Sequence, residues 1–306
     1  MSKIFEALKR LEGETGGTLV PGLGGAQMES EQTEPSMDAG PSGIEELLEP
    51  LPPEPAELAP LWEPGNGIRT LPLQVPQLLP VLPYDGKVAD WSVSEQYRII
   101  RTRILQNPRR PAMMVVSSPG PGDGKSVTAV NLAGVFALKS AANVLLVDGD
   151  VRRSTIHSQI GLSQSPGLAE VLEQSAMLEE ALIHTQQFPN LYVLTAGKRH
   201  ANPAELLDSP QWVDLCKQLR KLFAYIIIDS PPMAAVADYD LIQEQCDGVV
   251  LVVRPDHTRR DLCFKALETI PQQKLIGVVV NCVDNWFLSR TGYQDSYYYR
   301  DYAAGE

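Results

Sequence analysis

Residues 117–126 read Ser-Ser-Pro-Gly-Pro-Gly-Asp-Gly-Lys-Ser and stand between a short apolar run and a helical pattern. The run before them, 112–116, is apolar and partly β-branched, which is typical of a buried strand. After them, apolar residues recur at helical spacing, at Val127, Val130, Leu132, Ala133, Phe136, Ala137 and Leu138. A strand, a glycine-rich turn and a helix in this order place backbone N–H groups and a helix N-terminus around a bound anion. The stretch therefore predicts a phosphate-binding loop.

The loop departs from the general pattern G-x-x-x-x-G-K-[ST] at one place, because Pro119 stands where the first glycine would be. Lys125 and Ser126 hold the positions of the lysine that reaches the outer phosphates and the hydroxyl that meets Mg²⁺. Three glycines in the loop still supply the backbone freedom that it needs. The alternative, a glycine-rich turn that binds nothing, is weakened by two later segments.

In these two segments an apolar run, 144–147 or 225–228, ends in acidic residues. The first run leads into Asp148, Asp150 and Arg152, and the second into Asp229. The carboxyl ends of parallel strands face the crevice in which ligands of such sheets bind. These carboxylates are therefore predicted to be metal ligands or a base, although a lone acid at a strand end can also be a structural cap.

The remaining elements alternate between strand and helix. Strands are expected at 191–194, 248–253 and 275–280, and helices at 92–105, 204–222 and 259–270. This alternation predicts an α/β fold of the nucleotide-binding kind, with a parallel sheet and helices on both faces. Asn281, which follows the last strand, either touches an adenine base or caps a turn.

The chain carries 26 Lys and Arg against 38 Asp and Glu, and its charge of −12 is concentrated near the N-terminus. Residues 11–68 contain no Lys or Arg and 12 acids, and 41–83 hold 11 of the 25 prolines. We therefore expect 13–83 to be a disordered, acidic, proline-rich linker, which argues against nucleic acid as the main ligand.

Residues 1–12 form an amphipathic pattern that is either a docking helix for a partner or membrane surface, or a frayed terminus. Neither a signal-peptide pattern nor an apolar run of about 20 residues is present, so we expect no membrane crossing by this chain itself. The four cysteines lack paired or metal-type spacing, as expected of reduced cytosolic thiols.

Residues 286–306 form a tyrosine-rich tail with Tyr293, Tyr297, Tyr298, Tyr299 and Tyr302. One interpretation is an edge strand or an aromatic patch that docks on a partner. The other is that a Mg²⁺-nucleotide site transfers a γ-phosphoryl group to these phenols. Each phosphate would add roughly −1.5 to −2 charge, so the tail would then act as a switch.

Together these segments resemble the bacterial tyrosine kinases of capsule and exopolysaccharide synthesis, which use a P-loop scaffold. The likeness covers about 91–302, which includes most of an expected kinase domain of 84–285 and most of the tail. The segments 121–126, 145–152, 226–231 and 202–207 are similar to segments of that family. Glu95, Arg98 and Arg101, which are spaced as in its oligomerisation motif, are otherwise a solvated charged face.

The resemblance implies a role for each site residue. Nucleotide binding falls to Gly120, Pro121, Gly122, Asp123, Gly124, Lys125, Ser126 and Val127. Lys125 would hold the β- and γ-phosphates of ATP, while Ser126, Asp229 and one of Asp148 and Asp150 would serve Mg²⁺. The other acid would accept the tyrosine proton, and Arg152 would stabilise developing charge or simply pair with an acid.

The resemblance also implies partners and a location. It predicts a homo-oligomeric ring, autophosphorylation of one subunit's tail at the neighbour's site, and disassembly afterwards. It further implies a separate membrane polysaccharide co-polymerase as activator, a cognate tyrosine phosphatase, and a cytoplasmic protein held at the inner face of the membrane by its partner. Its expected role is to regulate polymer synthesis and export.

Two alternatives stay open. A ParA/MinD-like positioning ATPase resembles the same fold but carries a signature lysine where Gly120 stands here. A nucleotide-binding assembly factor without enzymatic activity would use the tail only for docking. A eukaryotic-type kinase is set aside, because neither His-Arg-Asp nor Asp-Phe-Gly occurs.

Overall fold

The computed structural model describes residues 67–74, 91–139 and 142–283. The expected helix at 1–12, most of the linker and the tyrosine tail at 286–306 lie outside these residues. One part of the linker is described, and there Arg69–Leu71 forms strand β1. The expectation of disorder throughout 13–83 is therefore wrong at this point.

The described residues form one eight-stranded sheet with the order β1-β4-β5-β3-β6-β2-β7-β8. Its other strands are β2 (Met113–Ser117), β3 (Val144–Asp148), β4 (Leu182–Thr185), β5 (Leu191–Leu194), β6 (Tyr225–Asp229), β7 (Gly248–Val253) and β8 (Leu275–Val280). Neighbouring strands are parallel except for β4 and β5, which pair antiparallel. The predicted parallel sheet is confirmed for the six strands from β5 to β8.

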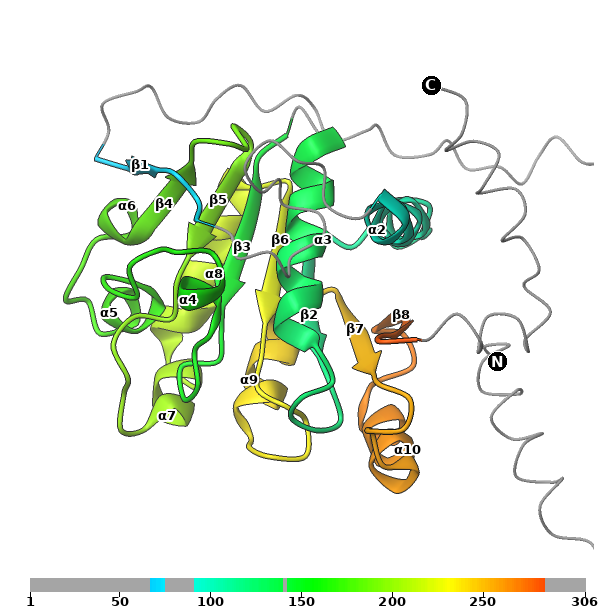
Figure 1. Ribbon diagram of the computed structural model, residues 1–306. Coiled ribbons are helices and arrows are strands. Elements are labelled where there is room, and N and C mark those ends of the chain that lie inside the picture. The colour runs from blue at the N-terminus through cyan, green and yellow to red at the C-terminus, as the bar shows by residue number, and fades with distance from the viewer. Residues whose placement is uncertain (1–66, 75–90, 140–141, 284–306) are drawn as a thin grey trace, which may run out of the picture. The chain divides into compact units, whose positions relative to one another are not determined.

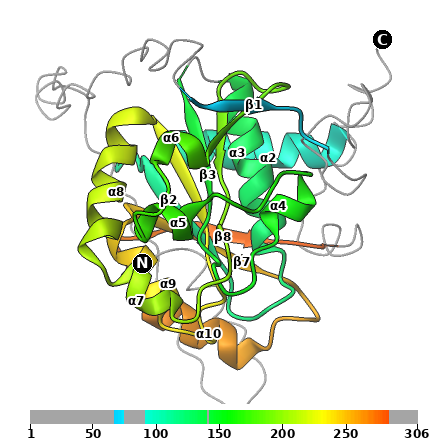
Figure 2. The ribbon, with the colours of Figure 1, turned by 90° about the vertical axis from the view of Figure 1, so that its left-hand side faces the viewer.

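Helices cover both faces of the sheet, as Figures 1 and 2 show. They are α2 (Trp91–Leu105), α3 (Lys125–Lys139), α4 (Ile156–Gln159), α5 (Leu168–Leu172), α6 (Leu178–Ala181), α7 (Pro203–Leu207), α8 (Pro210–Leu222), α9 (Asp238–Gln245) and α10 (Arg260–Thr269). In the described part of the chain, none of them is both long and apolar enough to cross a membrane.

The core lies in two layers, because side chains alternate between the faces of each strand. In β2, Met114 and Val116 pack in the layer that contains α2 and α3, and Met113 and Val115 pack in the layer of α8 and α9. All of these methionines and valines are at most 1% exposed. The strand is thus buried on both sides, which explains its continuous apolar sequence.

The expected helix at 204–222 is wrong in one respect, because the structure has two helices there. Pro210 has no backbone N–H, so it disfavours the interior of a helix, whereas proline fits the first turn of a new one. Ser209 caps that new helix, and its hydroxyl accepts a hydrogen bond from the Trp212 N–H at 3.3 Å. The turn between the helices follows from this Ser-Pro pair.

Asp247 fixes the start of β2, the strand that leads into the glycine loop. Its Oδ2 accepts hydrogen bonds from the backbone N–H groups of Ala112 (2.9 Å) and Met113 (2.8 Å). The Arg220 guanidinium donates to both oxygens of Asp247, at 2.8 and 2.9 Å. Partial burial raises the pKa of Asp247, but these donors outweigh it and leave the pKa below its ordinary value.

We expect Asp247→Asn to lower the free energy of unfolding by about 1–2 kcal/mol at pH 7, a range already discounted for the partial exposure of the site. A depressed pKa gives stability that is present above the unfolded-state pKa and is lost on acidification. The difference should therefore shrink toward pH 3 in urea unfolding. Asp214→Asn, which removes an exposed pair with Lys217 (2.9 Å), is the control and should cost less than about 0.5 kcal/mol.

Candidate active site

The glycine loop joins β2 to α3 at the carboxyl edge of the sheet, seen at the lower end of the molecule in Figure 1. Gly122 and Gly124 have φ angles of +85° and +97°, which side-chain-bearing residues rarely adopt. A Cβ on Gly124 would also occupy the place of the Asn281 side chain, whose Nδ2 donates to the Asp123 carbonyl at 3.0 Å. Asn281 thus holds the loop from the end of β8.

The two acidic strand ends predicted from the sequence lie side by side. Asp148 of β3 and Asp229 of β6 are partners in the parallel register, and Val116 of β2 is the partner of Asp229 on its other side. Val116 belongs to the core layer under α3, so both carboxylates face the side of the sheet on which α3 begins. The register brings them to the first residue of that helix, Lys125.

Lys125 lies between carboxylates. Its Nζ is 3.5 Å from Asp150 Oδ2 and 3.6 Å from Asp229 Oδ1, and it donates to the Ser126 hydroxyl at 3.1 Å. Only 13% of the Lys125 side chain is exposed, and Asp229 is fully buried. Four predicted site residues, Lys125, Ser126, Asp150 and Asp229, therefore form one buried polar cluster.

Backbone donors fix the acids that follow β3. The Asp148 oxygens accept hydrogen bonds from the N–H groups of Asp150 (3.3 Å) and Ile156 (3.2 Å), while Asp150 Oδ1 accepts one from Arg153 (2.9 Å). Asp148 is 0% and Asp150 5% exposed. The turn after the strand thus holds both carboxylates without consuming all of their acceptor capacity.

Burial raises the pKa values in this cluster. Burial, followed by the charge of Asp229, raises the pKa of Asp148 to about 8. Burial also raises the pKa of Asp229, to about 6, although the Lys125 ammonium opposes the shift. Burial lowers the pKa of Lys125, but the three acids outweigh it and the net shift is upward. Burial and mutual repulsion thus make Asp148 and Asp229 harder to ionise than free aspartates in the metal-free site.

Arg152 pairs with an acid, as one of the two interpretations of this residue predicted. Its guanidinium makes a bidentate pair with Asp238 at the start of α9, with Nε to Oδ2 at 2.7 Å and Nη2 to Oδ1 at 2.9 Å. Asp238 is buried, whereas 38% of the Arg152 side chain is exposed. Arg152 is therefore paired with an acid, and Asp238 is a residue that sequence reasoning missed.

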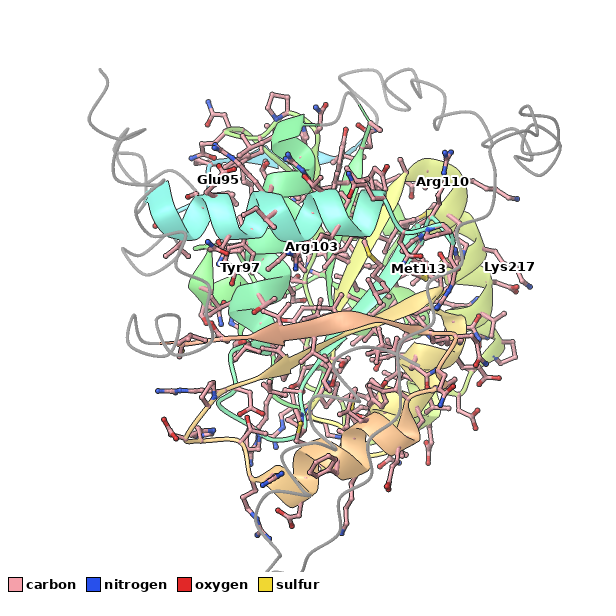
Figure 3. The ribbon with its side chains drawn as sticks, turned by 90° about the vertical axis from the view of Figure 1, so that its right-hand side faces the viewer. Glu95, Tyr97, Arg103, Arg110, Met113 and Lys217 are labelled. Atoms are coloured by element: carbon pink, nitrogen blue, oxygen red, sulfur yellow. The ribbon has the colours of Figure 1, made fainter. Side chains whose placement is uncertain are left out.

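The predicted oligomerisation residues lie away from this cluster, on α2, which Figure 3 shows with Glu95, Tyr97 and Arg103 labelled. Glu95 and Arg98 form a local ion pair at 3.0 Å. The Arg101 Nη1 instead donates to the Val135 carbonyl of α3 at 2.6 Å, and burial lowers the pKa of Arg101. The three side chains thus do not form one uniform exposed stripe.

The loop has neighbours that the sequence did not reveal. Asp123, 1% exposed, accepts hydrogen bonds from Thr258 Oγ1 at 2.7 Å and from the loop's own Gly120 N–H at 3.1 Å, and lies 3.1 Å from His257 Nδ1. His257 and Thr258 belong to the segment between β7 and α10, more than 130 residues away. No spacing pattern marks a contact over such a distance.

The chemistry of the cluster suits Mg²⁺ held together with a nucleotide. Both oxygens of Asp229 are buried and lack a hydrogen-bond partner within the described part of the chain, so they are available to a cation. Among the same residues, no group of three or more His, Cys, Asp or Glu forms a metal site by itself. Mg²⁺ typically uses one or two carboxylates together with substrate phosphates and waters, which fits Asp229, Ser126 and an anionic ligand.

Comparison with known proteins identifies the family. Residues 113–263 match the model of the AAA domain family. The chain is 38% identical over 192 residues to the tyrosine-protein kinase YwqD of Bacillus subtilis, covering 61% of this chain and 80% of that protein. It is 35% identical over 196 residues to the tyrosine-protein kinase CpsD of Streptococcus pneumoniae serotype 4, covering 62% of this chain and 84% of CpsD. The chain belongs to the bacterial tyrosine kinase family.

Solved structures agree with this assignment. The kinase superposes on the chimerical protein CapA2B2 with a TM-score of 0.62 and 30% identity, covering 71% of this chain and 94% of that one. It superposes on the VpsO kinase domain with a TM-score of 0.56 and 30% identity, covering 63% and 97% of the two chains. The predicted P-loop fold and the predicted tyrosine kinase activity are confirmed. The fold implies a nucleotide ligand.

Proposed function

We propose that this kinase transfers the γ-phosphoryl group of ATP to the tyrosines of the tail 286–306 on a neighbouring copy of itself. The observation that carries the proposal is the buried cluster in which Lys125 lies between Asp150 and Asp229 at the end of the glycine loop. A cation held by acids at a phosphate-binding loop provides the charge neutralisation and positioning on which phosphoryl transfer depends.

In the proposed reaction, the loop 120–127 binds the phosphates through backbone N–H groups at the N-terminus of α3. Lys125 leaves its acidic partners and binds the β- and γ-phosphates. Ser126, Asp229 and Asp148 would hold Mg²⁺, which would supply charge neutralisation at the phosphates when bound. The Arg152–Asp238 pair fixes the turn that carries Asp150, since Arg152 directly precedes the residue whose N–H binds that acid.

We assign the proton-accepting role to Asp150 rather than to Asp148. Asp148 is fully buried at the strand end, beside Asp229, while Asp150 lies on the turn beyond the strand and is slightly exposed. A base must come within hydrogen-bond reach of the phenol, so access decides between the two acids. Asp150→Asn should therefore impair transfer but preserve Mg²⁺-dependent ADP binding, whereas Asp148→Asn should impair both.

The proposal includes the wider context expected for the family. Glu95, Arg98 and Arg101 would contact a neighbouring subunit in a ring, and tail phosphorylation would dissociate it. A membrane polysaccharide co-polymerase would activate the kinase and hold it at the inner face of the membrane, and a tyrosine phosphatase would reset the tail. The relatives support this kinase function over a positioning ATPase or a non-enzymatic assembly factor.

The proposed transfer between copies is tested by mixing two full-length variants, neither of which can phosphorylate its own tail. One variant carries Lys125→Met with an intact tail, and the other keeps Lys125 but has phenylalanine at Tyr293, Tyr297, Tyr298, Tyr299 and Tyr302. After incubation with Mg²⁺ and ATP, with and without an activator fragment, mass spectrometry should find phosphate on the first variant only in the mixture. Phosphate on neither variant in any mixture, despite modification of the unaltered chain, would contradict transfer in trans.

A further inference from the structure

The glycine loop is held by the segment that joins β7 to α10. The Asp123 carboxylate is almost fully buried, and it faces Thr258 Oγ1 at 2.7 Å and His257 Nδ1 at 3.1 Å. Because β2 and β7 are parallel neighbours, with Ser117 paired to Leu251, their carboxyl ends finish side by side. The segments that follow the two strands therefore share the edge of the sheet at which phosphates bind.

His257 does more than contact Asp123. Its ring lies against Gly122, where an added Cβ would be 3.0 Å from Cε1 and 3.1 Å from Nε2. Nδ1 is engaged by the carboxylate, so Nε2 is the nitrogen that remains for another partner. The His257 side chain is 46% exposed, so the ring lies beside the loop backbone and is open to solvent or a ligand.

A purely structural role leaves part of this arrangement unexplained. The Thr258 hydroxyl already donates to the same oxygen of Asp123, and Gly120 N–H donates to the other. Two exposed arginines that follow His257 are engaged elsewhere: Arg259 pairs with Asp261 at 2.7 Å, and Arg260 lies 5.7 Å from the centre of the Phe264 ring. His257 is the residue of this segment that contacts the loop and still presents a free polar atom.

We propose that His257 is a further nucleotide-binding residue, which presents Nε2 to the phosphate groups held by the glycine loop while Asp123 fixes its ring. An imidazolium donates through both nitrogens, so it can bind the Asp123 carboxylate and a phosphate oxygen at once. This proposal deepens the nucleotide-binding part of the proposed function and rests on it.

Two substitutions distinguish the role of Nδ1 of His257 from the role of Nε2. His257→Asn keeps an amide N–H near the position of Nδ1 and removes Nε2, whereas His257→Gln places an amide near Nε2 and gives up the Nδ1 contact. We expect His257→Asn to weaken ADP binding roughly 5- to 20-fold, which corresponds to the loss of one charge-assisted hydrogen bond. The ADP affinity of His257→Gln should lie between those of His257→Asn and the unaltered chain. ADP affinity in Mg²⁺ buffer is measured by isothermal titration calorimetry on the full chain.

The matched control is His200→Asn, since His200 also lies beside a carboxylate, Glu173 at 3.3 Å, and should leave ADP affinity unchanged. The nucleotide-free His257→Asn variant, which keeps the contact with Asp123, should melt at the temperature of the unaltered chain, whereas His257→Gln, which loses that contact, should melt at a slightly lower temperature. Normal ADP affinity in His257→Asn, or equal losses in the Asn and Gln variants, would overturn the proposal. Because ADP binding involves no phosphoryl transfer, failure here is distinct from failure of the proposed autokinase reaction.

Discussion

Replacing Lys125 with methionine is expected to lower phosphoryl transfer to the tail by at least about a thousandfold. Methionine nearly preserves the length and apolar body of the side chain but removes the ammonium that lies between Asp150 and Asp229. The phosphates then lose the lysine ammonium as a partner, and the acids lose the positive charge that reduces their mutual repulsion. Incubation with Mg²⁺ and ATP followed by mass spectrometry of the tail measures the loss.

Lys217→Met is the matched control for this experiment. Lys217 lies on α8, far along the chain from the loop, and 67% of its side chain is exposed in a local pair with Asp214. Its replacement should leave transfer within about twofold, because exposed pairs contribute little. Thermal unfolding of Lys125→Met should remain cooperative; a folded Lys125→Met variant that phosphorylates the tail at the unaltered rate would refute the role given to Lys125.

The site residues that the sequence predicted lie at or just after the carboxyl ends of strands. Each of β2, β3 and β6 is a short apolar run followed by a change in composition, and parallel pairing brings such ends to one edge. Because β3 and β6 are adjacent in the sheet, Asp148 and Asp229 are register partners, although the sequence did not predict the strand order. The approach of Lys125 follows as well, because α3 starts directly after the loop.

The contacts that the sequence did not predict join residues far apart in the chain. Arg152 and Asp238 are 86 positions apart, and Asp123 and His257 are 134 apart. Each of these side chains is an ordinary polar residue in its local stretch, so only the folded arrangement of the loops pairs them. Strands β1 and β4 were missed for a different reason, since β1 is Arg-Thr-Leu and β4 is Leu-Ile-His-Thr, and neither contains an apolar run like that of β5.

A local signal existed for the break between α7 and α8. Ser209 followed by Pro210 is a common start of a helix, yet the apolar spacing continues on both sides and predicted one helix over 204–222. At this position proline chemistry outweighs hydrophobic periodicity, because Pro210 lacks the N–H that a continuous helix would need there.

Asp229→Asn is expected to make the nucleotide-free protein more stable at alkaline pH while lowering transfer by at least about a hundredfold. The substitution removes a buried negative charge whose two oxygens lack hydrogen-bond partners in the described structure, and with it a proposed Mg²⁺ ligand. The size of the activity loss is measured with the same tail phosphorylation assay, and stability is measured by urea unfolding in EDTA.

The pH dependence provides the sharper test of this variant. Burial raises the folded-state pKa values of Asp148 and Asp229 to about 8 and about 6, above the ordinary aspartate value near 3.9. The folded protein therefore retains protons that the unfolded chain releases, and its free energy of unfolding falls as the pH rises from about 4 to about 8. With one of the two charges gone, the decline in Asp229→Asn should be smaller by more than about 1 kcal/mol between pH 5 and 8.5. An exposed-site variant, Asp214→Asn, should follow the unaltered protein; if Asp229→Asn does so too, the buried carboxylates do not repel each other as the structure requires.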